Sequence, residues 1–242
     1  MKFAFRMPKY MPNSRFSDCW SSVGEVTFFH RDGVCFWKKR AHPAFPGTMA
    51  QLEHQSVHLR ALEAWRGLMP EVQEQWNALA VPVHSHRPPF RKDHHISGYN
   101  LFVSAYHGFA ELGDEHIPVP MARRAFPPFS VEMAGCEAVE GVLVVRFRVR
   151  MPQETEPSRY RLHTKMQLTS SGGGKRPGYM RVFVAEGNCT GDDCIAEVRV
   201  PDYKSLWNLD LTSYRMHCRL SLIDTVTGYR NDWIAGSFDI SL

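Results

Sequence analysis

Histidine is the residue type in this sequence with the clearest capacity for chemistry, because its neutral imidazole binds transition metals and titrates near neutral pH. Ten of the twelve histidines precede residue 117. His54 and His58 stand four residues apart in a stretch of helical periodicity, so they should share one face of a helix and could hold a metal. Four more histidines crowd the following segment: His84, His86, His94 and His95.

A zinc site of the His-Glu-x-x-His kind also needs its acid, and here Gln55, Ser56 and Val57 separate the pair. No acidic third ligand is evident nearby in sequence. We therefore expect solvated or hydrogen-bonded histidines and no metal site. A histidine-based metal enzyme stays a second alternative function.

Two other stretches contain residue types found at phosphate-binding or catalytic sites but lack the spacing of the corresponding motifs. The run from Gly172 to Arg176 does not have the spacing of a phosphate-binding loop, and it should join two strands, whereas the phosphate loop joins a strand to a helix. Ser97-Gly98 does not lie in a Gly-x-Ser-x-Gly elbow. The sequence offers no catalytic residue, no cofactor-binding residue and no cofactor, so we expect a protein that is not an enzyme.

The composition is that of an ordinary globular protein, with 43% hydrophobic and 22% charged residues in 242. The net charge of +4 is a mild basic bias that nucleic-acid-binding proteins often exceed. No apolar run approaches the roughly 20 residues that span a membrane, and the apolar start of the chain stops at Arg6. We expect a cytoplasmic or virion-associated protein without membrane insertion.

The six cysteines are irregularly spaced, which does not indicate a disulfide framework. We expect reduced thiols, and the sequence does not say whether any pair is bonded.

The first structured element should be a β-hairpin. Two β-rich runs, residues 24–31 and 34–40, flank Asp32-Gly33, a strong hairpin signal because both turn residues tolerate positive φ. A lone hairpin is marginal in water, so it must dock on its own helices or on a partner. Its bulky and basic side chains form our candidate interaction surface: Phe28, Phe29, Phe36, Trp37, Lys38, Lys39 and Arg40.

Three helices should follow. Thr48 and Gln51 fit a capping box that opens a helix over residues 49–67, with Leu52, Leu59, Leu62 and Trp65 at helical spacing. Pro70 suits the first position of a second helix, in which Trp76 belongs to the apolar stripe. Ser97 can cap a third helix that ends at Gly113.

Beyond two proline pairs near residues 118–128 the apolar period changes to two. Arg146, Arg148 and Arg150 alternate with apolar residues in the clearest strand, 142–150, and five more short strands should follow. We therefore predict an α+β chain: a hairpin and three-helix region over residues 1–117, then an antiparallel immunoglobulin-like β-sandwich over residues 129–242.

The hairpin stretch resembles the amino terminus of uncharacterised bacterial and phage-associated families. These begin with a Gly-x-Val-Gly-x-Val hairpin followed by Arg/Lys-Pro, and here Val23, Gly24 and Val26 precede Asp32-Gly33 and Lys39-Arg40. The resemblance covers about residues 14–70 and implies no activity.

A second resemblance is to the HMG box. The stretch from Trp65 to Ala80 is similar to the second half of that box, and Ser97 to Phe102 is similar to its opening Ser-Ala-Tyr-x-x-Phe, in reversed order. It implies a DNA-binding alternative. We do not favour it, because the expected helices carry only Arg60 and Arg66 as cations.

The sequence thus favours a non-enzymatic structural or protein-interaction protein, in a setting such as a phage-like or surface assembly. Its partner would be another protein or a further copy of the chain. Nucleic-acid binding through the HMG-like helices is the first alternative.

Overall fold

The computed structural model describes residues 21–31, 34–40, 47–83, 95–114, 116–191 and 193–241. The predicted Asp32-Gly33 turn, Cys19 and the histidines at 84, 86 and 94 lie outside this range. The chain divides into two compact units, Met1–Gln51 and Leu52–Leu242. The predicted division into residues 1–117 and 129–242 stays a prediction.

The first unit holds a three-stranded antiparallel sheet in the order β1-β2-β3. Its strands are β1 (Ser21–Val23), β2 (Val26–Arg31) and β3 (Val34–Lys39). The predicted hairpin is therefore confirmed as β2 and β3, and β1 adds a strand that the sequence pattern did not indicate. Gly24 forms the turn between β1 and β2 with a φ of +57°, a conformation that glycine adopts without strain.

Three helices follow, α1 (Met49–Gly67), α2 (Pro70–Ala80) and α3 (Gly98–Glu111), so the predicted helical region is confirmed. The capping box is present, because the backbone N–H of Thr48 donates to Gln51 Oε1 at 3.2 Å and that of Gln51 donates to Thr48 Oγ1 at 3.4 Å. Ser97 caps α3 by accepting from the backbone N–H of Asn100 at 3.2 Å.

The helices share one apolar core around Trp76 and Phe102, both 0% exposed, whose rings meet edge to face at 5.5 Å. Trp65 packs on the same core but is only half-buried. Of the residues at helical spacing in α1, Leu52 and Leu59 are exposed. Only the second half of α1, from Val57 and Ala61 onward, packs on this core.

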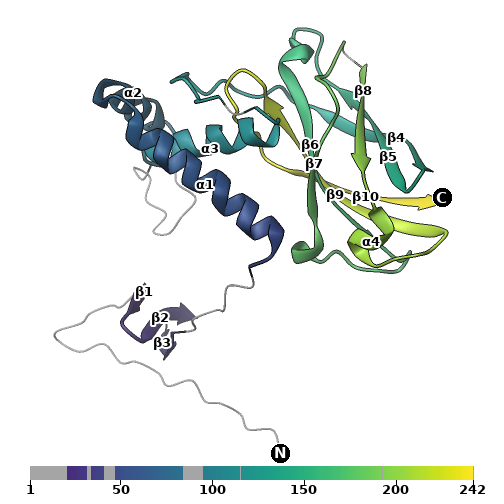
Figure 1. Ribbon diagram of the computed structural model, residues 1–242, viewed down its shortest axis with the longest axis horizontal. Coiled ribbons are helices and arrows are strands. Elements are labelled where there is room, and N and C mark those ends of the chain that lie inside the picture. Colours follow the sequence, from purple (N-terminus) through teal and green to yellow (C-terminus); the bar gives the residue numbers. More distant parts are fainter. Residues whose placement is uncertain are drawn as a thin grey trace, which may run out of the picture. The chain divides into compact units, whose positions relative to one another are not determined.

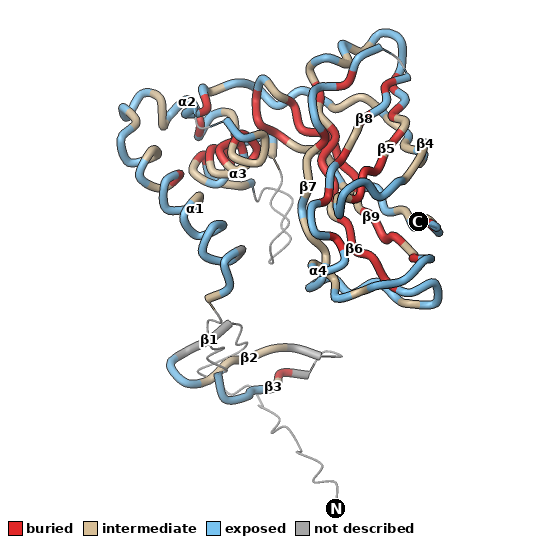
Figure 2. The backbone as a smooth tube through the Cα atoms, turned by 45° about the vertical axis from the view of Figure 1, so that its right-hand side comes forward, coloured by how far each residue is buried: buried red, intermediate tan, exposed pale blue. Residues whose placement is uncertain are grey.

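Seven strands form two antiparallel sheets, β4-β5-β8 and β10-β9-β6-β7 (Figure 1). They are β4 (Ser130–Val139), β5 (Val142–Arg150), β6 (Tyr160–Thr169), β7 (Arg181–Val184), β8 (Asp193–Val200), β9 (Ser213–Asp224) and β10 (Ile234–Ser241), with α4 (Tyr203–Trp207) between β8 and β9. Residues of both sheets belong to a single apolar core, and the buried stretches concentrate on α3, β5, β6 and β9 (Figure 2).

The sequence pattern did not indicate β4. Its half-buried residues alternate with exposed ones only as far as Gly135, and the alternation is lost where Gly135 and Cys136 are both half-buried next to a register shift. The turn that joins it to β5 has positive φ at both Glu140 and Gly141, +49° and +83°, as a two-residue hairpin turn requires.

Helix α3 approaches the turn between β9 and β10 unusually closely. A Cβ on Gly108 would lie 1.8 Å from the carbonyl oxygen of Gly228, and a Cβ on Gly228 would lie 2.4 Å from that of Ala105. The next residue, Tyr229, joins the core of the helices. The helical region and the sheets are therefore in direct contact within the second unit.

Among the described residues, no helix is both long enough and apolar enough to cross a membrane.

Replacing Trp76 with Ala should lower the free energy of unfolding by about 3–5 kcal/mol, as for buried Trp generally. Trp76→Phe should cost less, because it keeps an aromatic ring and removes an indole N–H that has no hydrogen-bond partner among the described residues. Urea unfolding measures both. Equal losses for Trp76→Ala and for the half-buried Trp65→Ala would contradict the arrangement of this core.

Gly108→Ala should destabilise the protein, because the added methyl group forces α3 away from Gly228. Gly67→Ala is the matched control, since Gly67 is also helical and nothing lies within 4 Å of its Cβ position. Alanine favours a helix by about 1 kcal/mol over glycine. Wild-type or higher stability of Gly108→Ala in urea unfolding would show that the close approach is absent in solution.

Candidate functional site

All seven residues of the candidate interaction surface lie on or directly after the β2–β3 pair. Phe28 pairs with Trp37 and Phe29 with Phe36, so the two aromatic pairs lie on opposite faces of the sheet. Phe29 and Phe36 stack at 5.7 Å with 20° between their planes, and Lys38 Nζ lies 5.7 Å from the centre of the Phe29 ring.

The solvent-facing part of this surface is basic and aromatic. Trp37 is 37% exposed, and Lys38, Lys39 and Arg40 are exposed as well. The backbone N–H of Arg40 donates to the carbonyl of Glu25, which fixes the end of β3. The structure therefore brings together the residues that the sequence singled out. Lys39 lies on the same face of the sheet as the exposed indole of Trp37, Lys38 lies on the opposite face beside Phe29, and Arg40 directly follows the strand.

The predicted histidine pair acquires a third member from another helix. The ring of His107 on α3 stacks on His54 at 4.8 Å and on His58 at 5.9 Å, with interplanar angles of 28° and 29°. Near-parallel stacking directs ring faces, not ring nitrogens, at one another. Within the described ranges, no group of three or more His, Cys, Asp or Glu side chains is arranged to hold a metal ion.

The same stack makes His107 hard to protonate. Burial is the main cause, and the neighbouring His54 and His58 reinforce it, so the pKa of His107 falls to about 4. Sequence reasoning missed His107 because nothing in the α3 pattern distinguishes it from any other half-buried residue. The helical spacing of α1 alone could not indicate which element covers the pair.

One turn further along α3, Glu111 reaches the sheet. Its Oε2 accepts from Arg230 Nη1 at 2.7 Å and lies 3.1 Å from Nε2 of His163 on β6. The contact with His163 is within ion-pair range. On the other side of the ring, His163 Nδ1 lies 3.1 Å from the hydroxyl of Ser221, its cross-strand partner on β9.

A hydroxyl, an imidazole and a carboxylate in series are also the parts of a hydrolytic triad. Here His163 and Ser221 are both 0% exposed, so neither can meet a substrate in this conformation. Trp233 covers the imidazole at 4.8 Å, and Lys165 Nζ lies 5.0 Å from the Trp233 ring centre. The arrangement is that of a buried polar junction between α3 and the sheet.

The pKa values of the two titratable partners follow from this burial. Burial lowers the pKa of His163, although Glu111 opposes the shift. Burial alone would raise the pKa of Glu111, but His163 and Arg230 outweigh it and place this pKa below its ordinary value. The resting junction therefore consists of a neutral imidazole, a carboxylate and a guanidinium.

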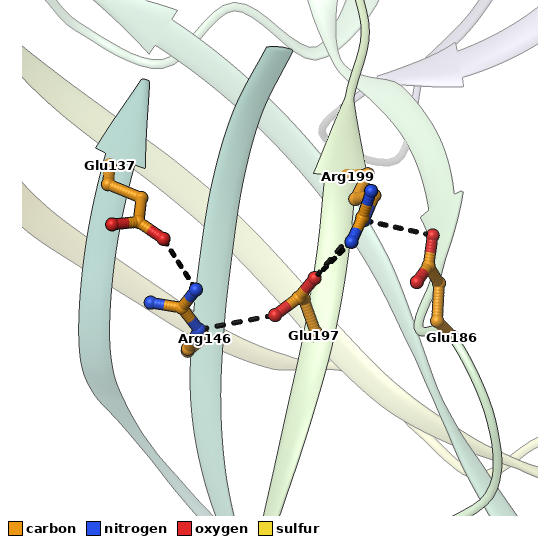
Figure 3. Close-up of polar contacts among 5 residues, drawn as sticks. All are labelled: Glu137, Arg146, Glu186, Glu197 and Arg199. Atoms are coloured by element: carbon orange, nitrogen blue, oxygen red, sulfur yellow. Dashed lines mark hydrogen bonds and ion pairs between the residues drawn. The ribbon is translucent and has the colours of Figure 1, made fainter. Parts of the chain in front are cut away.

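The predicted row of outward arginines on β5 is paired with acids. Arg146 contacts Glu137 on β4 and, through Nε at 3.2 Å, Glu197 on β8; Glu197 also meets Arg199, which reaches Glu186 (Figure 3). Arg150 likewise pairs with Glu132 at 3.0 Å. Exposed pairs of this kind contribute little stability, but they neutralise a face that would otherwise attract polyanions.

The five described cysteines are free thiols, as expected. Burial raises the pKa of Cys136 to about 11 and that of Cys218 to about 12, which keeps both thiols protonated. A hydrogen bond between Cys189 and Cys194 raises the pKa of the first and lowers that of the second to about 7. Both side chains are buried, so this pair offers no accessible nucleophile.

Comparison with known proteins assigns no family. No protein-family model matches the chain, and no curated protein matches it in sequence. Solved structures of OgpA from Akkermansia muciniphila match part of it. The wild-type protein in one crystal form is 12% identical with a TM-score of 0.31, and a catalytically inactive form in complex with an O-glycopeptide (glycodrosocin) substrate is 13% identical with the same TM-score. Each match covers 49% of this chain and 30% of the other. A likeness this partial carries no argument about function.

We expect acid to destabilise the protein before the pH falls to the range in which most of its carboxylates titrate. Histidines of the unfolded chain titrate near 6.5, whereas the pKa values of His107 and His163 in the folded protein lie lower, so the unfolded state binds more protons in this interval. Stability should therefore be full above pH 6.5 and decline toward pH 4. Glu111, whose pKa is also lowered, adds a loss of the same sign at more acid pH.

Urea unfolding between about pH 7 and about pH 4 measures this decline. His107→Phe keeps a ring in the stack but cannot take up a proton, so its decline should be shallower than that of wild type. His95→Gln, at an exposed histidine, is the control and should follow wild type. An unchanged decline in His107→Phe would show that the stack does not contribute.

Proposed function

We propose that this chain is a non-enzymatic interaction protein whose β1–β3 sheet binds an acidic surface on a protein partner. The observation that carries the proposal is the exposed Trp37 on β3, with Lys39 on its face of the sheet and the exposed Lys38 and Arg40 next to it along the chain. Tryptophan and arginine recur at the energetic centres of protein interfaces, and cations steer association with acidic partners.

The modular position of this sheet supports the proposal. It belongs to a compact unit of its own, Met1–Gln51, separate from the unit that contains the other helices and sheets. Its two faces both carry aromatic pairs, Phe28 with Trp37 and Phe29 with Phe36. A sheet this small is marginal in water, so further burial against a partner would stabilise it.

We infer that the second unit is the scaffold, with its strands in an immunoglobulin-like sandwich. The sheet orders support this inference. When β4 to β10 are counted along the chain as strands one to seven, the first, second and fifth form one sheet (β4-β5-β8), and the third, sixth and seventh belong to the other (β10-β9-β6-β7), as in an immunoglobulin-like sandwich. β7, the fourth strand, pairs with β6, the third. The shared core of the two sheets agrees with such packing. A phage-like or surface assembly remains our proposed setting for this architecture.

Protein is favoured over nucleic acid by the distribution of positive charge. Helices α2 and α3 contain no Lys or Arg, Arg66 is the one cation of the HMG-like stretches, and the arginines of β5 are paired with acids. Each neutralised phosphate adds about 0.9 to the salt slope of duplex binding, so three sheet cations would hold DNA weakly at physiological salt.

Chemical cross-linking of the full chain in extracts of its native cells, read by mass spectrometry, would test the proposal. Wild-type protein should cross-link through residues 21–40 to an acidic protein. Trp37→Ala and the double reversal Lys38→Glu/Lys39→Glu should each reduce that product at least about tenfold. The matched double reversal Arg66→Glu/Arg124→Glu, at two exposed arginines of the other unit, should not.

Two results would count against the proposal. Loss of the product after nuclease treatment would favour the nucleic-acid alternative. Equal yields from both double reversals would show that the β1–β3 sheet is not the contact.

A further inference from the structure

The second unit contains a small cavity at the loop that joins β6 to β7. Its volume is about 260 Å³, and its walls come from the end of β6, the glycine-rich loop and the region of α4. Six of the residues that line it define the site: Gln167, Thr169, Gly173, Arg176, Tyr179 and Trp207. The glycine-rich loop is the run from Gly172 to Arg176, whose sequence lacks the spacing of a phosphate-binding loop.

Gln167 supplies an unsatisfied hydrogen-bond donor to this cavity. Its side chain is 4% exposed, and its Oε1 accepts from the backbone N–H of Arg176 at 2.8 Å, which fixes the orientation of the amide. Its Nε2 donates to no acceptor among the described residues, yet it is not one of the fully enclosed unpaired atoms. This NH₂ group can therefore donate to an oxygen ligand that enters the cavity.

Arg176 supplies the charge. Its side chain is exposed and forms no ion pair with any described residue, in contrast to Arg146 and Arg199 on the other sheet. No acidic residue lines the cavity. A cavity lined by an arginine and an amide, with no acid beside them, is suited to a carboxylate, which accepts two hydrogen bonds in one plane.

Aromatic side chains form the remaining wall. The indole N–H of Trp207 donates to the carbonyl of Tyr179 at 2.9 Å, and the indole packs edge-on against Phe183 at 6.4 Å. Both contacts fix the plane of the indole. The Tyr179 side chain is 53% exposed beside it, so a flat ring can stack here without displacing core residues.

The floor of the cavity is held in place before any ligand arrives. The carbonyl of Gly173 lies 3.0 Å from His217 Nε2 and accepts from Thr169 Oγ1 at 3.2 Å, while His217 Nδ1 lies 2.9 Å from Ser237 Oγ. A Cβ on Gly173 would lie 2.7 Å from Thr169 Cβ, so the loop follows this path only with glycine there. A fixed floor lowers the ordering cost of binding.

We propose that this cavity binds a small carboxylate carried on a flat ring. The carboxylate accepts hydrogen bonds from Gln167 Nε2 and Arg176, and the ring stacks against Trp207 and Tyr179. The small volume accommodates a single ring, and a ligand of that size binds with a dissociation constant of roughly a millimolar. The site is independent of the β1–β3 sheet and of the partner proposed for it.

The proposal is tested by titrating the full chain with benzoate while the Trp207 indole and Gln167 side-chain amide signals are followed by ¹H–¹⁵N NMR. Benzyl alcohol has the ring without the charge, acetate has the carboxylate without the ring, and inorganic phosphate is an unrelated anion. We expect benzoate to shift both signals and to bind at least about tenfold more tightly than each of the other three.

Two variants and a matched control locate the site. Gln167→Glu keeps the acceptor for the Arg176 N–H but replaces the donor with a negative charge, and Arg176→Gln removes the cation. Each should weaken benzoate binding at least about tenfold. Lys175→Gln removes the neighbouring exposed charge, which does not line the cavity, and should leave binding unchanged. Should Gln167→Glu fail to fold, the comparison of Arg176→Gln with Lys175→Gln decides alone.

The proposal is overturned if benzoate shifts neither signal at high millimolar concentration. It is also overturned if acetate or phosphate binds as tightly as benzoate, because the site is then a general anion site. Equal binding of benzyl alcohol would reduce the site to an apolar crevice, and equal effects of the two loop substitutions would place the ligand elsewhere.

Discussion

The second unit depends on the absence of side chains where α3 crosses the turn between β9 and β10. Gly108 and Gly228 bring two backbones so close that the methyl group of an alanine on either would collide with a carbonyl oxygen. This approach places the last turn of α3 over β6, where Glu111 can reach both Arg230 and the fully buried His163. Without it, the imidazole and the carboxylate would be separated, and the core around Phe102 would lose Tyr229.

The same approach decides what the polar groups of the junction can do. His163 and Ser221 have the chemical identities of a base and a nucleophile, but α3 and Trp233 enclose them. A buried ion pair is weak evidence for stability, because desolvation offsets its attraction, and it is better suited to fixing one arrangement of the helix on the sheet. The cations of β3 are exposed, in contrast to the enclosed polar groups of this junction.

The parts of the fold that were predicted from sequence are those governed by local physics. Thr48 with Gln51, Pro70 and Ser97 mark helix ends through contacts within a few residues, and the structure confirms all three helices. β4 was missed because its apolar alternation is short and is interrupted at Gly135, next to a register shift. Leu52 and Leu59 fall at helical spacing in α1 and are nevertheless exposed, because spacing does not say where the facing helix ends.

The candidate sites divide in the same way. The aromatic and basic surface of β2 and β3 was predictable because its members are neighbours in sequence. Three other groupings have members far apart along the chain: His107 with His54, Glu111 with His163, and Gln167 with Trp207. Each such grouping is set by the packing of whole elements. A residue pattern in a single sequence carries no information about it.

The distance along the chain between the two sides of the α3 contact has a kinetic consequence. Glu111 and Arg230 are 119 residues apart, so α3 cannot be fixed on the sheet until nearly all of the intervening strands have been synthesised and paired. At about 5–20 residues per second, a nascent chain would carry α3 without its partner for roughly 6 to 24 seconds. During that interval Phe102 packs with α1 and α2, whereas Phe109 lacks the Gly228 turn that lies against its ring. Productive folding thus depends on the helical region remaining soluble until the last strands arrive.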